Sequence, residues 1–292
     1  MSVSAVTYYR SLKAKDQAPC EVTEAVTRVF WENSMRYGSR RISEELREQE
    51  IKAGRHQVRR ILAKEGLLAI QPRSFVPRTT QSRHLLGYSP NLLLDLELPP
   101  SAPNEILVGD ITYLPLQSGK WGYLATWMDL FSRKVVGWAV ADNMEEGLIL
   151  EAFKMVLRRR RLPAGAIVHS DRGGQYAGKR FRSLLRAHNL RQSMSRTGET
   201  YDNAFAESLF SRIKAELLEG GCFVDVSHAR SELFNYLEGY YNRVRRHSGL
   251  GYVSPDVYER NFAAGTMKPT KKMIDRKPTK GIENKQHSSN TF

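Results

Sequence analysis

Residues 105–116 form the run EILVGDITYLPL, the first of three successive runs of β-branched and aromatic residues. The second run is KWGYLATWMDLF at 120–131, and the third is KVVGWAVAD at 134–142. Gly119-Lys120 and Ser132-Arg133 lie at the junctions and are short enough for hairpin turns. The three runs therefore predict the strands of a β-meander.

Helical and strand patterns alternate after this meander. They occur in the order helix 144–161, strand 166–170, helix 178–189, strand 190–195, helix 202–218 and helix 226–247. A meander that changes into alternating helices and strands is typical of an α/β sheet of mixed direction with helices on both faces. We therefore expect a mixed sheet of five strands, flanked by helices.

The region 21–68 has apolar residues at helical spacing, interrupted at Gly38 and at the turn 52–54. Two short helices joined by a glycine-containing turn, the second rich in arginine, predict an all-α helix-turn-helix domain. A plain helical bundle with a solvated basic face is the alternative. In the first interpretation the side chains that face DNA are Arg55, Gln57, Arg59 and Arg60.

The remaining segments divide the chain further. We expect an N-terminal segment at 1–20, a basic linker rich in proline and serine at 69–104, an α/β core domain at 105–262 and a tail at 263–292. The tail is rich in lysine and has few apolar residues, so we expect it to be disordered.

Bulk composition restricts the class of protein. The 292 residues suffice for about two domains, and the net charge of +14 favours a polyanionic partner, with nucleic acid ahead of an anionic membrane surface. No apolar run reaches the roughly 18 residues of a membrane span, and the N-terminus has no apolar core of the signal-peptide type. Two cysteines are too few for a disulfide framework or a cysteine-rich zinc site. We therefore expect a cytoplasmic protein.

Three acids occupy unusual positions in this scheme. Asp110 lies inside the first strand run, Asp171 directly follows the strand 166–170, and Glu207 lies in the helix 202–218. A buried acid in a strand is costly unless it is paired or binds a metal. Carboxylate oxygens are the ligands that Mg²⁺ prefers, and two ions about 3.5–4 Å apart can serve phosphoryl transfer. The sequence therefore predicts metal-assisted phosphoryl transfer, with a paired structural acid as the alternative for Asp110.

The helix 202–218 is amphipathic. One face carries Asn203, Glu207, Ser211 and Lys214, and the other carries Phe205, Leu209, Ile213 and Leu217. We expect the apolar face to pack on the sheet, which directs Glu207 away from the core. Lys214 on the polar face is expected to contact phosphate or base near the metals.

Several other residues have a structural interpretation as well as a functional one. These are Asp129 as a partner of arginines, Asp202 as a helix cap, His169 as a hydrogen-bonded strand-end residue, Gly173 and Gly174 as a tight turn, and the arginines at 158–161 as charges at a helix end. We expect Trp121, Trp127 and Trp138 in the core. The basic aromatic residues at 240–247 contact DNA, another protomer or the core, and the sequence leaves these three open.

The acids and the words around them resemble a known family. Asp110, Asp171 and Glu207, with 35 residues between the second and third, are similar to the DD(35)E pattern of transposases and retroviral integrases. The surrounding motifs resemble the insertion-sequence-three family of bacterial transposases over roughly 21–260. They are DITYLPL, MDLFSRKVVGWAV, HSDRGGQY, SMSRTGETYDNAFAESLFSRIKAEL and YYNRVRRHSGLGYVSPDVY.

This resemblance implies a ribonuclease-H-like core in which Asp110, Asp171 and Glu207 are catalytic and ligate two Mg²⁺ ions, with Mn²⁺ as a substitute. It implies cutting of one DNA strand at each element end, followed by attack of the freed 3′-hydroxyl on another phosphodiester. Lys214, Arg196 and Asn203 would then contact DNA.

The implied partners are the terminal inverted repeats and the target DNA. A homodimer or higher oligomer is expected in the synaptic complex, and family members often carry an upstream part fused by a frameshift. No membrane partner is implied, and the protein is expected in the nucleoid of a bacterium.

Two other functions remain open at this stage. A structure-selective nuclease of the same fold would cut DNA without joining it. A DNA-binding regulator that has lost catalysis would only bind DNA, although the intact set of three acids argues against it.

Overall fold

The computed structural model describes residues 20–71, 87–94, 96, 99–195, 204–218 and 221–266. Arg196, Asp202 and Asn203 lie outside these ranges, as do the N-terminal segment, much of the expected linker and almost all of the tail. The Phe205 side chain is also outside the described part, so its predicted packing is not seen.

The centre of the molecule is a mixed sheet of five strands in the order β3-β2-β1-β4-β5. The strands are β1 (Ile106–Pro115), β2 (Trp121–Asp129), β3 (Val135–Ala141), β4 (Ile167–Ser170) and β5 (Arg191–Met194). The pairs β1–β2 and β2–β3 are antiparallel, and β1–β4 and β4–β5 are parallel. The predicted meander and the mixed direction of the sheet are confirmed.

The turns of the meander adopt left-handed backbone conformations. Gly119 has a φ of 75° and Arg133 a φ of 61°. Asp129 is buried at the second turn, where its carboxylate accepts hydrogen bonds from the amides of Ser132 (2.8 Å) and Asn104 (2.6 Å). Burial raises the pKa of Asp129. Asp129 therefore has a structural role: its hydrogen-bond donors are loop amides, and its charge also acts on Arg133.

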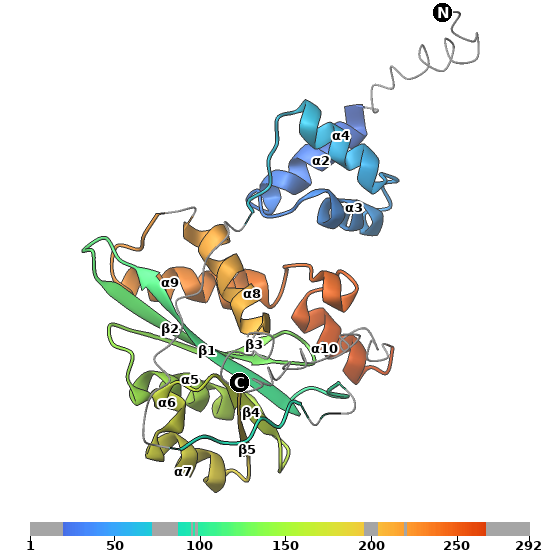
Figure 1. The fold of residues 1–292 in the computed structure, drawn as a ribbon. Helices are drawn as coiled ribbons and strands as arrows, with labels where there is room; N and C mark the ends of the chain where they lie inside the picture. The colour runs from blue at the N-terminus through green and yellow to red at the C-terminus, as the bar shows by residue number, and fades with distance from the viewer. Residues whose placement is uncertain are drawn as a thin grey trace, which may run out of the picture.

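Helices cover both faces of the sheet (Figure 1). The first face is covered by α5 (Glu146–Arg159), the short α6 (Gly174–Ala177) and α7 (Lys179–Ala187). The second face is covered by α8 (Ala204–Ile213) and α9 (Val226–Phe234). Alternate residues of β1 pack on opposite sides, Leu107 with the first group and Val108 with the second.

Trp127 is the centre of the core on the first face. Its ring stacks on Phe181 (centroids 5.6 Å apart) and meets Phe153 and Tyr176 edge to face. The neighbouring strand approaches this ring so closely that a Cβ at Gly109 would overlap it. Gly109 is therefore required for packing, directly before Asp110.

We expect Gly109→Ala to lower the free energy of unfolding by about 2–3 kcal/mol, because overpacking displaces either Trp127 or β1. Denaturant unfolding measures the loss. Gly147→Ala is the matched control, since a Cβ at this helical glycine meets nothing within 4 Å. The control is expected to be neutral or slightly stabilising. A Gly109→Ala protein as stable as the wild type would contradict this packing.

Some elements differ from the sequence prediction. The helix expected at 226–247 is α9 followed by the π-helical turn η3 (Asn235–Tyr241), and α8 continues into another π-helical turn, η2 (Lys214–Leu218). A short 3₁₀ turn, η4 (Ser248–Leu250), and α10 (Pro255–Ala263) follow and were not predicted. Trp127 and Trp138 are buried as expected, but Trp121 is 51% exposed. The core assignment of Trp121 is wrong because its end of β2 extends beyond the helices of the first face.

The N-terminal helices α2 (Cys20–Glu32), α3 (Ser39–Glu48) and α4 (Arg55–Lys64) form a unit with its own core, here called the helical unit. Phe30, Ile42, Leu46 and Val58 are fully or almost fully buried within it. The apolar spacing of the sequence therefore produces the expected helices. None of the helices in the described ranges has the length and apolar character that a membrane crossing requires.

Candidate active site and DNA-binding surface

Asp110 lies in β1, and Asp171 directly follows the parallel strand β4 beside it. Gly109 of β1 pairs with Ser170 of β4. Asp110 directly follows Gly109, and Asp171 directly follows Ser170. Paired strands are about 4.8 Å apart, so the two residues are close together. Both side chains are half-buried. The predicted meeting of these two acids is consistent with this register.

Each carboxylate accepts a hydrogen bond from the backbone beside it. Asp110 Oδ1 accepts from the amide of Ile111 (2.8 Å), and Asp171 Oδ1 accepts from the amide of Gly173 (2.9 Å). A Cβ at Gly173 would lie 3.0 Å from Asp171 Oδ1 and 2.8 Å from Gln175 Oε1. A side chain at position 173 would therefore crowd the Asp171 carboxylate and displace the Gln175 amide.

Tyr176 on α6 lies close to both aspartates. Its pKa is raised well above the ordinary value, first by complete burial and then by the negative charges of Asp110 and Asp171. Its hydroxyl has no hydrogen-bond partner within the part of the chain that the structure describes. Tyr176 belongs to the motif HSDRGGQY, but a buried tyrosine gives no signal by which sequence alone would assign it to a site.

His169 is a buried structural residue on β4. Its Nδ1 is 2.8 Å from the Ser193 hydroxyl and its Nε2 is 3.1 Å from the Ser195 hydroxyl, which links β4 to the end of β5. Burial lowers the pKa of His169 to about 4, so the ring is neutral at physiological pH. Arg172 supports the same junction by donating from Nε to the Ser195 carbonyl (2.7 Å). The structural interpretation of His169 fits this geometry.

Glu207 is exposed on α8, while Ala206, Leu209, Phe210 and Ile213 of the same helix are buried against the second face of the sheet. The predicted orientation of Glu207 away from the core matches this placement. Within the described ranges, no three or more acids, histidines or cysteines form a group that could hold a metal ion. The pairing of β1 with β4 brings the two aspartates together. In the described residues Glu207 does not join them in a group that could hold a metal ion.

Lys214 begins the π-helical turn η2, so the α-helical spacing from which its shared face with Glu207 was predicted ends at this residue. Its side chain is half-buried, and burial lowers its pKa. This ammonium group is therefore less hydrated than one on an open surface.

The outer face of α4 is basic. Arg55, Arg59 and Arg60 are exposed and Gln57 is half-buried, whereas Val58, Ile61 and Leu62 point into the helical unit. All four predicted DNA-contact residues of this helix are therefore accessible on the side away from its core. This arrangement is typical of a recognition helix.

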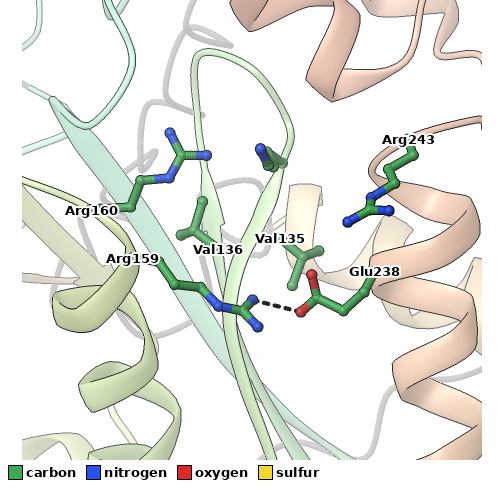
Figure 2. Close-up of a pocket in the computed structure, with 7 residues that line it drawn as sticks. Val135, Val136, Arg159, Arg160, Glu238 and Arg243 are labelled. Atoms are coloured by element: carbon green, nitrogen blue, oxygen red, sulfur yellow. Dashed lines mark hydrogen bonds and ion pairs between the residues drawn. The ribbon is translucent and has the colours of Figure 1, made fainter.

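A cavity of about 330 Å³ lies elsewhere, where β3 begins (Figure 2). Its cations are largely paired: Arg159 with Glu238 (2.6 Å), Arg160 with Glu259 (2.9 Å) and Lys134 with Asp256 (2.5 Å). It is lined by Lys134, Val135, Val136, Arg159, Arg160, Glu238 and Arg243, none of which is a predicted catalytic residue. We therefore assign the candidate active site to the two aspartates and not to this cavity.

Comparison with known proteins identifies the family. Residues 100–200 and 188–255 match two family models described as Integrase core domain, and residues 18–75 match one described as HTH-like domain. The chain is 42% identical over 234 residues to "Transposase InsF for insertion sequence IS3A" of Escherichia coli (strain K12), covering 80% of each chain. The chain belongs to the IS3 family of insertion-sequence transposases. The resemblance inferred from the motifs is confirmed.

A second transposase relative agrees with IS3 membership, and two retroviral structures are more distantly similar. The "Transposase for insertion sequence element IS904" of Lactococcus lactis subsp. lactis (strain IL1403) is 36% identical over 248 residues, which cover 85% of this IS3-family chain and 97% of the relative. A solved HTLV-2 integrase catalytic core domain in complex with magnesium aligns with a TM-score of 0.39 at 16% identity, covering 54% of this chain and 97% of that one. A simian T-cell lymphotropic virus intasome chain aligns with a TM-score of 0.43 at 14% identity, covering 76% and 70%.

Proposed function

We propose that this IS3-family transposase cuts one DNA strand at each element end and joins the freed 3′-hydroxyl to target DNA, with Asp110, Asp171 and Glu207 as its catalytic acids. The observation that carries the proposal is the register of β1 and β4, in which Gly109 pairs with Ser170. This pairing puts the two aspartates side by side on neighbouring segments, and α8, which carries Glu207, packs against β1.

The residues around the two aspartates fit a divalent cation. Two half-buried carboxylates offer hard oxygen donors, and the Tyr176 hydroxyl beside them is buried without a partner among the described residues. We propose that Asp110, Asp171 and Glu207 hold two Mg²⁺ ions, which Mn²⁺ can replace. Bound ions of this kind stabilise the attacking and leaving oxygens of a phosphoryl transfer.

Other residues around the two aspartates hold the backbone in place, leave space for a carboxylate or supply positive charge. The hydrogen bonds of His169 to Ser193 and Ser195 fix the end of β4, and Gly173 leaves space for the Asp171 carboxylate. Lys214 supplies a partly desolvated positive charge on the helix that carries Glu207. We propose that Lys214 contacts a DNA phosphate.

The proposed partners are element-end DNA and target DNA. We assign the basic face of α4 to the terminal repeats, and Arg196 and Asn203 to contacts near the active site. Synapsis of two ends requires a dimer or higher oligomer, and an upstream-frame protein or fusion is a further proposed partner. The protein would then act in the bacterial cytoplasm, at the nucleoid.

A strand-transfer assay tests this function. A labelled element-end duplex and a target duplex are incubated with the protein and Mg²⁺, and the products are separated by size. We expect a joined product that disappears when EDTA removes the metal. A cut product without joining would indicate a nuclease, and bound DNA without cutting would indicate a regulator. Either result would contradict the proposal.

The α4 assignment predicts a change in salt dependence. Each phosphate contact contributes about 0.9 to the slope of log K against log salt concentration, so Arg59→Ala should reduce that slope by about one. Element-end binding is measured at several salt concentrations. Arg158→Ala is the control. Arg158 is an exposed arginine at the end of α5, so this substitution removes the same charge at a site away from α4. An equal reduction for both variants would argue against a specific contact by α4.

A further inference from the structure

The helical unit contacts the core through the segment 236–247. The Tyr37 hydroxyl, fully buried, accepts a hydrogen bond from the amide of Arg246 (2.8 Å) and donates to the Val244 carbonyl (3.3 Å). Arg41 Nε donates to the Arg246 carbonyl (2.8 Å). These basic aromatic residues, for which the sequence left three roles open, therefore pack between two parts of the chain.

Arg246 holds α3 against this segment. Its Nε donates to Glu45 Oε2 (2.6 Å), and its two terminal nitrogens donate to the Glu48 carboxylate (2.7 and 2.5 Å). The Arg246 side chain is only 9% exposed, whereas its partner Glu48 is 57% exposed, so these charge-assisted bonds lie at the rim of the contact. The hydrogen bond from Arg246 lowers the pKa of Glu48.

The next residue back, Arg245, holds the turn that follows α8. Its guanidinium pairs with the Glu216 carboxylate (2.8 Å), and both side chains are almost fully buried. The Tyr236 hydroxyl donates to the same carboxylate (2.7 Å). Glu216 belongs to η2, the π-helical continuation of the helix that carries Glu207.

Arg36 of the helical unit reaches this turn directly. Its guanidinium lies over the Tyr240 ring (4.6 Å) and the Tyr236 ring (5.4 Å), and it donates to the Glu216 carbonyl (3.4 Å). The two arginines therefore contact Glu216 from two sides, Arg36 at its backbone and Arg245 at its side chain. Because Glu216 lies in η2, which continues α8, the contact between Arg36 and Glu216 connects the helical unit to α8.

We propose that Arg36, Arg245 and Glu216 are positioning residues, through which the docked helical unit fixes α8 and so places Glu207 relative to Asp110 and Asp171. This inference rests on the proposed function of those acids. Glu216 is nine positions after Glu207, which corresponds to about 13 Å of helix at 1.5 Å per residue. A helix fixed at one end transmits a shift to the other, and a misplacement of about 1 Å can cost roughly a hundredfold in rate.

The placement of the π-helical turn agrees with this role. π-Helical turns are rare and occur frequently at functional sites. Here the turn begins at Lys214 and contains Glu216, so it joins the catalytic helix to the ion pair. The exposed DNA-facing side of α4 has none of these contacts, which leaves it accessible while α3 is docked.

Arg36→Ala tests the inference on the full chain, because it leaves the buried Glu216–Arg245 pair complete. Amide hydrogen exchange of the metal-free protein is measured first. We expect amide exchange in 204–218 to become about tenfold faster, because local unfolding of this helix costs less free energy without the Arg36 contacts. Exchange rates in β1 and β2 should not change. Strand joining should fall by roughly 10- to 100-fold while DNA binding stays within about twofold.

Arg28→Ala is the matched control, since this exposed arginine of the same unit contacts Glu32 (3.9 Å) and Gln49 (3.0 Å) at the surface. It should leave exchange and joining at wild-type values. Arg36→Lys keeps the charge but loses the planar stacking, so it should restore only part of both properties.

Wild-type exchange in 204–218 of Arg36→Ala would overturn the inference, and so would faster exchange throughout the core, which indicates general destabilisation. The proposed function fails separately. It is contradicted by an Asp171→Asn protein that still joins DNA, whatever Arg36→Ala does.

Discussion

Asp171→Asn is expected to abolish strand joining, with a fall of roughly a thousandfold or more, while binding of element-end DNA changes by less than about twofold. A metal ligand contributes several kcal/mol to transition-state stabilisation, and about 4 kcal/mol corresponds to a thousandfold. The asparagine keeps the size of the side chain and its hydrogen-bond acceptor for Gly173. The fold and the basic face of α4 should therefore be unaffected.

The strand-transfer assay and a binding titration with the same labelled duplex measure this effect. Asp142→Asn provides the control, because it makes the same chemical change at an exposed acid that follows β3. It should join DNA at nearly the wild-type rate. Joining by Asp171→Asn at a rate close to wild type would remove Asp171 from the metal site.

Glu216→Ala is expected to lower the free energy of unfolding by about 3–5 kcal/mol, because it leaves the Arg245 guanidinium buried without its carboxylate partner. The Tyr236 hydroxyl also loses its acceptor. For a chain of this size, a loss of 1 kcal/mol lowers Tm by about 2–4 °C, so Tm should fall by roughly 10 °C. Calorimetry and denaturant unfolding measure these quantities.

The double variant Glu216→Leu with Arg245→Met is the informative control. Replacing both members of a buried ion pair with apolar residues of similar volume is often neutral, whereas removing one member is costly. The double variant should therefore recover most of the stability lost in Glu216→Ala. A single variant with wild-type stability would show that the pair is hydrated in solution and not buried.

Sequence reasoning predicted the sheet well because each strand has a strong local signal. The runs that became β1, β2 and β3 have β-branched and aromatic residues bounded by turn residues, and Gly119 and Arg133 lie in the expected turns. Asp110 and Asp171 come together because parallel pairing places the middle of β1 beside the end of β4. The placement of these two acids could therefore be inferred without coordinates.

Other features depend on contacts between distant segments and had no local signal. The π-helical turns at 214–218 and 235–241 keep an ordinary helical sequence pattern, so only the packing of Glu216 and Tyr236 reveals them. The exposure of Trp121 depends on where the covering helices end. The role of Arg246 depends on Glu45 of α3, 201 residues earlier in the chain.

The central claim is that Asp110, Asp171 and Glu207 hold the catalytic metal together. A crystal structure of the protein with an element-end duplex and Mg²⁺ tests it most directly. We predict metal density with carboxylate oxygens of all three residues at about 2.0–2.1 Å, the distance that Mg²⁺ requires. Metal bound elsewhere, or bound by the two aspartates with Glu207 directed to solvent, would contradict the claim.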